Sequence, residues 1–455
     1  MDINYWVAAH LSPTGRTAKI AWAIAAAGSA SGIFSSIGLA TEQTGRSAWV
    51  AYLLAALIGG FLRVIPPLIF TSMFRYKGGN YAMAAMTLGP LAGGIYALWW
   101  LPMFLSRGTS ASALGQYLQS VFPGLSPRWT SVALITIVFV VNLFGVKVMA
   151  KVQRPLMAVT VGTLLLFTAF GLTKLQPGSF AVTSPEYYTG GGLGVLLAVT
   201  LVIQPMSALA LLCGFSWEAK DSKRNIPFAI LAGSCLVTLI FVGVSFVAGN
   251  TLPVGEMAGK PMTYAARQIF PGALFPLFLL LGPVLALCSN LNASMSTISA
   301  PVLGAIRDGW LPRSIGRNNR HGSPWIVYTA MWLICVIPLI LGVSLKTFVA
   351  YTMMTQRISG LLLLVVAFHL PNRFPRQWAN ALWHLPKGVY YLLLTLSGLT
   401  EVGTLIASAI ATSLSVFLGN LCLVAALAAY ALFRYRSGKA HVVIQAEGFE
   451  ECRAG

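Results

Sequence analysis

The chain has 455 residues, of which 57% are apolar and only 9% are charged. A soluble domain carries roughly 25% charged residues, so this composition excludes a water-soluble enzyme, a secreted domain and a disordered chain, and it predicts an integral membrane protein. The net charge of +19 comes from basic residues in short segments between apolar runs, so it reflects membrane topology and does not predict nucleic-acid binding.

The sequence contains about twelve apolar runs long enough to span a bilayer, since a span needs about 20 mostly apolar residues. The predicted spans are 18–41, 47–73, 91–120, 129–149, 154–174, 193–216, 226–250, 272–303, 324–343, 346–370, 388–410 and 413–434. The stretch from Met262 to Phe270 predicts a short amphipathic helix outside the membrane, before the eighth span.

The distribution of Lys and Arg predicts the orientation. With the N-terminus in the cytoplasm, the inside segments hold about 21 of the 30 basic residues and the outside segments about 6. An inverted protein, or one span fewer, would remove this asymmetry. We therefore expect an even number of spans, with both termini in the cytoplasm.

Two spans carry residues that interrupt a helix near its middle. The first contains Gly28–Gly32, a run of small residues that weakens a helix, and the sixth contains Gln204–Ala208 with a proline inside. A small-residue packing stripe and a simple kink are the alternatives. Two interruptions five spans apart favour a transporter site, because broken helices expose N–H groups that suit a carboxylate and carbonyls that suit an ammonium group or a cation.

Five motifs in chain order resemble those of the amino acid–polyamine–organocation (APC) superfamily of transporters. They are Gly28–Phe34, Lys77–Tyr81, Asn142–Lys147, Lys220–Pro227, and Arg307–Pro312 followed by Gly322–Pro324. The resemblance covers most of the chain and identifies the superfamily without identifying the substrate.

The resemblance implies an all-α membrane protein with a LeuT-like fold. Residues 18–174 and 193–370 would form two inverted five-helix repeats with broken helices 1 and 6, and residues 388–434 the peripheral helices 11 and 12. Residues 1–17 and 435–455 would be cytoplasmic. The resemblance also implies alternating access around a site between helices 1, 3, 6, 8 and 10.

The resemblance further implies which residues bind the substrate. The amides of Ser29–Gly32 would hold its carboxylate, and carbonyls near Ala26–Ala27 and Gln204–Ser207 would hold its amino group. The candidate residues are Ala26, Gly28, Ser29, Ala30, Ser31, Gly32, Gln204, Met206, Ser207 and Ala208. Many relatives carry an acidic residue at the break of helix 6. This chain has none there, so an acidic gate is missing.

The coupling ion stays open between H⁺ and Na⁺. Sodium-independent relatives often carry a lysine in the fifth helix, where this chain has Thr160. Hydroxyls of the eighth helix bind sodium in sodium-coupled relatives, which makes Ser296 and Thr297 the corresponding candidates. We expect no cofactor and no metal site.

Three arginines lie inside predicted spans: Arg63, Arg107 and Arg357. A charge at the bilayer centre costs about 2.5–3.5 kcal/mol on insertion scales, so it normally faces a cavity or a partner. Because arginine binds a carboxylate through two hydrogen bonds, Arg107 and Arg357 predict an anionic substrate. The alternative is that they brace the bundle, which we expect of Arg63.

The sequence therefore predicts a secondary active transporter of amino acids or related small metabolites in the bacterial plasma membrane, with an acidic amino acid as substrate. A neutral amino acid exchanger is the alternative. An embedded enzyme or a channel is more distant, because the histidines lie in loops or at span ends and Glu401 is the clearest acid inside a span. Glu401 falls in a peripheral helix, where we expect a structural partner. The expected partners are the small molecule and the lipid bilayer; the oligomeric state stays open.

Overall fold

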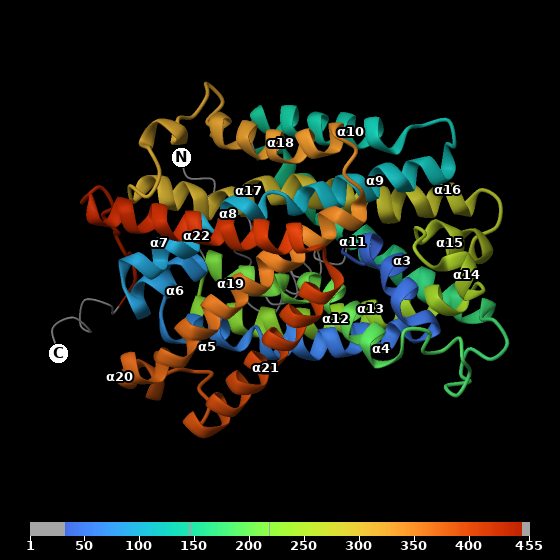
Figure 1. The fold of residues 1–455 in the computed structure, drawn as a ribbon, viewed down its shortest axis with the longest axis horizontal. Helices are drawn as coiled ribbons and strands as arrows, with labels where there is room; N and C mark the ends of the chain where they lie inside the picture. Colours follow the sequence, from blue (N-terminus) through green and yellow to red (C-terminus); the bar gives the residue numbers. More distant parts are fainter. Residues whose placement is uncertain (1–31, 145–146, 218, 448–455) are drawn as a thin grey trace.

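The computed structural model describes residues 32–144, 147–217 and 219–447 (Figure 1). These ranges contain helices and connecting segments, with an isolated antiparallel bridge between Tyr76 and Ala446 as their sole β-type pairing. Most of the long helices run along the longest axis of the molecule, while α21 (Lys387–Ala411) crosses the bundle obliquely (Figure 1).

The first five predicted spans coincide with helices, although the first is described only from residue 32 onward. Their helices are α3 (Gly32–Thr44); α4 (Ala48–Ala55), η3 (Ala56–Leu62) and α5 (Ile65–Met73); α7 (Pro90–Leu98), α8 (Trp100–Met103) and α9 (Ser106–Val121); α10 (Pro127–Leu143); and α11 (Lys147–Gly171) with η4 (Leu172–Lys174).

The other seven predicted spans also coincide with helices. These are α12 (Gly191–Ser207) with η5 (Ala208–Phe215); α13 (Ser222–Asn250); α16 (Leu274–Leu279), η6 (Leu280–Val284) and α17 (Leu285–Arg307); α18 (Trp325–Ile340); α19 (Leu345–Arg373); α21; and α22 (Leu414–Arg436). Short helices connect them: η2 (Gly45–Ser47), α6 (Gly79–Leu88), α14 (Val254–Met257), α15 (Thr263–Ile269), η7 (Arg313–Gly316) and α20 (Pro375–Ala379). The helix α15 confirms the short helix predicted before the eighth span.

Seven helical stretches of the described chain are long and apolar enough to cross a membrane. One of them, Gly32–Met73, contains the described part of the first predicted span and all of the second, and three shorter apolar helices coincide with the fourth, fifth and ninth. The third predicted span is divided into α7, α8 and α9 and is not among these stretches. The chain is thus an all-helical, multi-span membrane protein.

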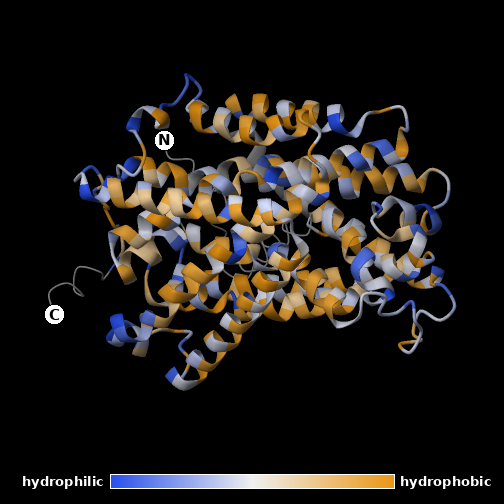
Figure 2. Ribbon diagram, in the orientation of Figure 1, coloured by the Kyte–Doolittle hydropathy of each residue, from blue (hydrophilic) through white to orange (hydrophobic). Residues whose placement is uncertain are grey.

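The outer helices consist largely of apolar residues (Figure 2). Only 17% of the residues in the most apolar 18-residue stretch of α22 are buried, whereas 56% are buried in the corresponding stretch of Gly32–Met73. Leu399 and Ile410 of α21 and Leu414 of α22 are among the exposed large apolar residues. A surface of this kind is stable against lipid and not against water.

Three spans depart from α-helical geometry, and a glycine or a proline lies at each departure. In the second span the π-helix η3 contains Gly59, where a Cβ atom would lie 2.7 Å from the backbone oxygen of Ile203. In the sixth, α12 contains Pro205 and passes into the 3₁₀-helix η5 after Ser207, where the sequence predicted a break. In the eighth, the π-helix η6 contains Pro283.

The helix α6 corrects the sequence prediction, which placed a connection between residues 73 and 91. Gly78 and Gly79 adopt positive φ angles of 112° and 56°, which turn the chain into this helix, and Gly89 with φ 97° ends it. All but one of its residues are buried. A helix of this length is too short to register as a span, and its burial depends on packing against α7 and η5.

A buried polar group links α6 to the segment after α17. The hydroxyl of Tyr81 donates a hydrogen bond of 2.6 Å to Asp308, and the indole of Trp310 donates one of 3.3 Å to Tyr81. Burial raises the pKa of the Tyr81 hydroxyl well above its usual value, and the hydrogen bond to Asp308 raises it further, so Tyr81 stays a donor. Trp310 is completely buried.

The chain after α22 lies across the same region. The amide of His441 donates to the backbone oxygen of Asp308 at 2.9 Å, and the amide of Lys77 donates to that of Gln445 at 3.0 Å. Arg75 and Glu447 form an ion pair of 2.9 Å. The tail therefore connects the α5–α6 turn with the segment after α17.

We expect Trp310→Ala to destabilise the protein by about 3–5 kcal/mol, because it leaves a cavity and removes a partner of Tyr81. Thermal unfolding of the purified protein in detergent measures the effect. Trp129→Ala is the matched control, because Trp129 is 57% exposed, and it should change the unfolding temperature little. Equal effects of both substitutions would contradict the packing described for Trp310.

Candidate functional site

A cavity of about 430 Å³ lies in the middle of the bundle. Its wall contains residues of α3, α9, α12, α17 and α19, which correspond to predicted spans 1, 3, 6, 8 and 10, together with residues near η3 and on α21. The polar and charged residues of this wall are Ser35, Ser36, Arg63, Asn80, Tyr96, Trp100, Ser106, Arg107, Thr109, Ser110, Gln204, Ser207, Asn290, Thr352, Gln356, Ser359, Ser397 and Glu401.

At one side of the cavity α3 crosses α12 at very short distance. Gly32 begins α3, and a Cβ atom there would collide with the ring of Pro205. Glycine at this position therefore allows the two helices to touch. In the next turn the hydroxyls of Ser35 and Ser36 donate to the backbone oxygen of Gly32 at 3.0 and 2.9 Å.

The end of α12 contributes the next part of the wall. Pro205 cannot donate a backbone hydrogen bond, and the α-helix ends two residues later. Gln204, Ser207 and Ala208 line the cavity, and the hydroxyl of Ser207 donates to the backbone oxygen of Ile203 at 2.9 Å. Met206 is 1% exposed and packs in the apolar core.

Arg107 of α9 brings a positive charge to the cavity wall. Its guanidinium donates to the Ser106 hydroxyl at 3.0 and 2.7 Å and to the side-chain oxygen of Asn290 at 3.1 Å. Asn290 lies on α17 and also accepts a bond of 3.3 Å from Ser110. These acceptors are neutral, so they orient the guanidinium without cancelling its charge.

A second charged group lies at the wall formed by α21. Arg63 makes an ion pair with Glu401 through Nε and Nη2, and its Nη1 lies 3.4 Å from the Ser207 hydroxyl. Arg357 of α19 is completely buried, and its Nη1 lies 3.7 Å from Oε2 of Glu401. We call Arg63, Arg357 and Glu401 the charge cluster.

The structure brings five of the predicted site residues into the cavity wall: Gly32, Arg107, Gln204, Ser207 and Ala208. Ala26 and Gly28–Ser31 lie outside the described residues. Arg357 lies behind the wall, in contact with Glu401.

The predicted ion-binding residues lie on two neighbouring helices. Thr160 is 6% exposed on α11, and Ser296 and Thr297 lie on α17, their side chains being outside the described ones. The helices α11 and α17 pack against each other. Among the described residues, no group of three His, Cys, Asp or Glu side chains could hold a metal ion.

Sequence reasoning missed Asn290, Gln356 and the position of Glu401 in the wall. Asparagine and glutamine inside spans are a weak signal, because they also bond to their own helix. Glu401 was identified as the clearest acid in a span, but its assignment to a peripheral helix placed it away from the cavity. Its partner Arg63 lies 338 positions away in the chain, and no local pattern predicts such a pair.

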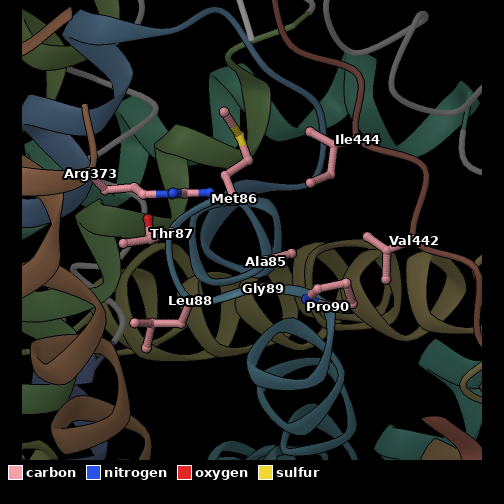
Figure 3. A pocket seen from close by; sticks show the side chains of 9 residues that line it. All are labelled: Ala85, Met86, Thr87, Leu88, Gly89, Pro90, Arg373, Val442 and Ile444. Carbon is pink, nitrogen blue, oxygen red and sulfur yellow. The ribbon is translucent and has the colours of Figure 1, made fainter. Parts of the chain in front are cut away.

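A second cavity, of about 360 Å³, lies beside the turn between α6 and α7 (Figure 3). The α6–α7 turn around Gly89 forms its floor, the side chain of Arg373 extends over it, and Val442 and Ile444 of the tail close the opposite side. Most of its lining is apolar. Thr87 and Arg373 are the polar residues of its lining, far fewer than in the wall of the central cavity.

A sequence profile described as "Amino acid permease" matches residues 19–431 of the chain. The matched region includes every helix that lines the central cavity.

Several characterised or named proteins are similar over large parts of the chain. The branched-chain amino acid permease BcaP of Lactococcus lactis is 23% identical over 72% of this chain and 74% of its own length. A methylthioribose transporter of Bacillus subtilis is 21% identical over 53% and 56%. A putative histidine permease of the same species is 25% identical over 49% of each chain.

We expect Gly32→Ala to lower the stability of the protein by about 1–3 kcal/mol, because the added methyl group pushes α3 away from Pro205. Thermal unfolding in detergent measures the loss. Gly192→Ala in α12 is the control, since a Cβ atom at Gly192 meets nothing within 4 Å. An unchanged unfolding temperature for Gly32→Ala would contradict the close crossing of α3 and α12.

Proposed function

Because the chain belongs to the amino acid permease family of the APC superfamily, we propose that it is a secondary active transporter that moves an amino acid or a related small metabolite by alternating access. The central cavity supports this proposal, because helices from both halves of the chain form its wall. The two inverted repeats would be residues 18–174 and 193–370. The protein would lie in the bacterial plasma membrane, with both termini in the cytoplasm.

We propose that the substrate's amino acid group binds where α3 and α12 meet. Its carboxylate would approach the backbone of Ser29–Gly32, and its amino group the carbonyls near Ala26–Ala27 and Gln204–Ser207. The contact between Gly32 and Pro205 supports this placement, because it brings the two interrupted helices together at the cavity wall. Interrupted helices at membrane depth are tolerated where they line a cavity.

The proposal that the substrate is anionic rests on Arg107. Its guanidinium lies in the cavity wall, held by neutral acceptors on α9 and α17. A held but uncompensated guanidinium is suited to a carboxylate, which it binds through two charge-assisted hydrogen bonds. The substrate would be an acidic amino acid, such as glutamate or aspartate, or a metabolite with a similar anionic side group.

The second candidate is an exchanger of neutral amino acids. The similarity to the branched-chain amino acid permease favours it, as do the apolar wall residues Leu39, Leu201 and Val349. In that case Arg107 would brace α9 against α17 and would not contact the substrate. The two candidates differ in which substrates depend on Arg107.

We expect Arg107→Ala to reduce uptake of acidic amino acids by about tenfold to a hundredfold, because a hydrogen bond to a charged group contributes about 1.5–3 kcal/mol. Arg107→Lys should restore it poorly, since lysine cannot form the paired bonds. Uptake of labelled acidic, neutral and basic amino acids into proteoliposomes is the measurement.

Arg376→Ala on the exposed helix α20 is the control for loss of one positive charge and should transport normally. Preferred transport of branched-chain or other neutral amino acids by the wild-type protein, unaffected by Arg107→Ala, would establish the neutral exchanger. Preferred transport of arginine or lysine would contradict both candidates.

We further propose that Thr160, Ser296 and Thr297 contribute to a Na⁺ site between α11 and α17. The packing of these two helices supports it. Replacing sodium by choline should then reduce uptake strongly at constant ionic strength, as measured in the same proteoliposomes. Unchanged uptake in choline would remove sodium and leave proton coupling or obligate exchange.

A further inference from the structure

The charge cluster carries an excess positive charge inside the bundle. It contains two guanidinium groups, Arg63 and Arg357, and one carboxylate, Glu401. Side-chain exposures are 11%, 0% and 3%, so water screens these charges little. Since a buried carboxylate between two guanidiniums stays ionised, these three groups together carry one positive charge that no other described residue is seen to balance.

In the described part of the chain, the helices that pack most extensively against α21 supply no further negative charge. They are α19, α12 and η3. No charged residue occurs in α12 or η3, and α19 carries, besides Arg357, the basic residues Lys346, His369 and Arg373 near its ends. On α21 itself, Lys387 is the first residue of the helix, whereas Glu401 lies near its middle.

The N–H groups of the buried Arg357 guanidinium are also without hydrogen-bond acceptors among the described residues. Among the described residues, Nε, Nη1 and Nη2 of Arg357 have no hydrogen-bond partner, although Nη1 lies 3.7 Å from Glu401. Oε2 of Glu401 likewise accepts no hydrogen bond. Buried charged groups are normally both paired and hydrogen-bonded, because the desolvation penalty of a charged group is large. The N–H groups of Arg357 therefore lack an acceptor in the described part of the chain, and an anion is the kind of group that would supply one.

The cluster meets the central cavity at Gly360. This residue lies one turn after Arg357 on α19, and it lines the cavity together with Arg63, Glu401 and Ser207. A Cβ atom at Gly360 would lie 2.7 Å from both Nη2 of Arg63 and Oε1 of Glu401. Glycine therefore lets the backbone of α19 pack directly against the ion pair, and both partners of the pair still line the cavity.

We propose that the charge cluster is a binding site for one monovalent anion that enters from the central cavity. The anion balances the excess charge and accepts hydrogen bonds from the guanidinium groups, with the Ser207 hydroxyl at hand beside Arg63. A cation is repelled from this position, and a neutral group leaves the charge unbalanced. The site is separate from Arg107, whose guanidinium is held by α9 and α17.

Two sources can supply this chemistry: a free halide, or a carboxylate of the transported substrate. Binding of a halide is independent of the proposed function, whereas binding of a substrate carboxylate rests on the proposal that the protein transports an acidic amino acid. Both are tested by thermal unfolding of the purified full-length protein in detergent. The first arm replaces sodium isethionate by sodium chloride at constant ionic strength. The second, in chloride-free buffer, compares glutamate and aspartate with glutamine and asparagine.

Three variants identify the site. Arg357→Gln removes the excess charge and leaves the Arg63–Glu401 pair neutral, so the anion response should weaken at least tenfold in apparent affinity. Gly360→Ala retains every charge but places a methyl group against the ion pair and shifts its groups, so it should also weaken the anion response, and it tests the site if Arg357→Gln fails to fold. Arg373→Gln removes the same charge at the exposed end of the same helix and should respond as the wild type does.

Stabilisation by chloride that is lost in Arg357→Gln and Gly360→Ala supports the site with a free anion. Stabilisation only by the carboxylate-bearing amino acids, lost in the same variants, supports the site with the substrate. Absence of any anion response in the wild type, or an equal response in wild type and variants, overturns the proposal. Wild-type uptake is measured separately, so a protein that transports no acidic amino acid but responds to chloride contradicts the proposed function and supports this site.

Discussion

Gly32 touches the ring of Pro205, and the arrangement of the central helices depends on this contact. The absence of a side chain at Gly32 allows α3 to cross α12 beside the proline that ends its α-helical geometry. Gly59 of the second span also packs closely against α12. A Cβ atom at Gly59 would lie 2.7 Å from the Ile203 oxygen and 2.9 Å from the Ser207 hydroxyl. Helices that pack this closely through backbone leave side chains free to shape a cavity on the remaining side.

The cavity also determines where charges can lie. A bilayer core offers no water, so a charged side chain needs a polar space or a partner inside the bundle. Arg107 donates hydrogen bonds to neutral oxygens on its own helix and on α17. Arg63 forms an ion pair with Glu401 at the cavity wall. The arginines inside the spans thus lie at the cavity wall or directly behind it, together with Glu401.

The sequence predicted the helices well, because a run of about 20 apolar residues has few alternatives in a membrane protein. It also predicted the interruption after Pro205, whose missing donor acts locally. It failed at α6, a ten-residue helix buried by its tertiary contacts, and it treated α7, α8 and α9 as one span. Hydropathy does not distinguish a divided helix from a continuous one.

The residues of the site likewise divide into those with a local sequence signal and those that depend on contacts between distant helices. Gly32, Arg107, Gln204 and Ser207 could be predicted, because glycine, proline and intramembrane arginine are unusual residues with local consequences. The pairing of Arg63 with Glu401 could not, because it joins the second span to the eleventh. A helix that the resemblance makes peripheral therefore contributes a side chain to the cavity wall.

This pairing constrains how the bundle can move. Breaking a buried ion pair by separating its partners costs about 3–5 kcal/mol, so Arg63 and Glu401 keep the end of η3 and the middle of α21 together. The bond from Arg107 to Asn290 likewise joins α9 to α17. All four of these residues line the cavity. Alternating access, as proposed for this chain, would therefore open and close the cavity along the boundary between the two linked pairs of helices, where apolar contacts can slide without separating charges.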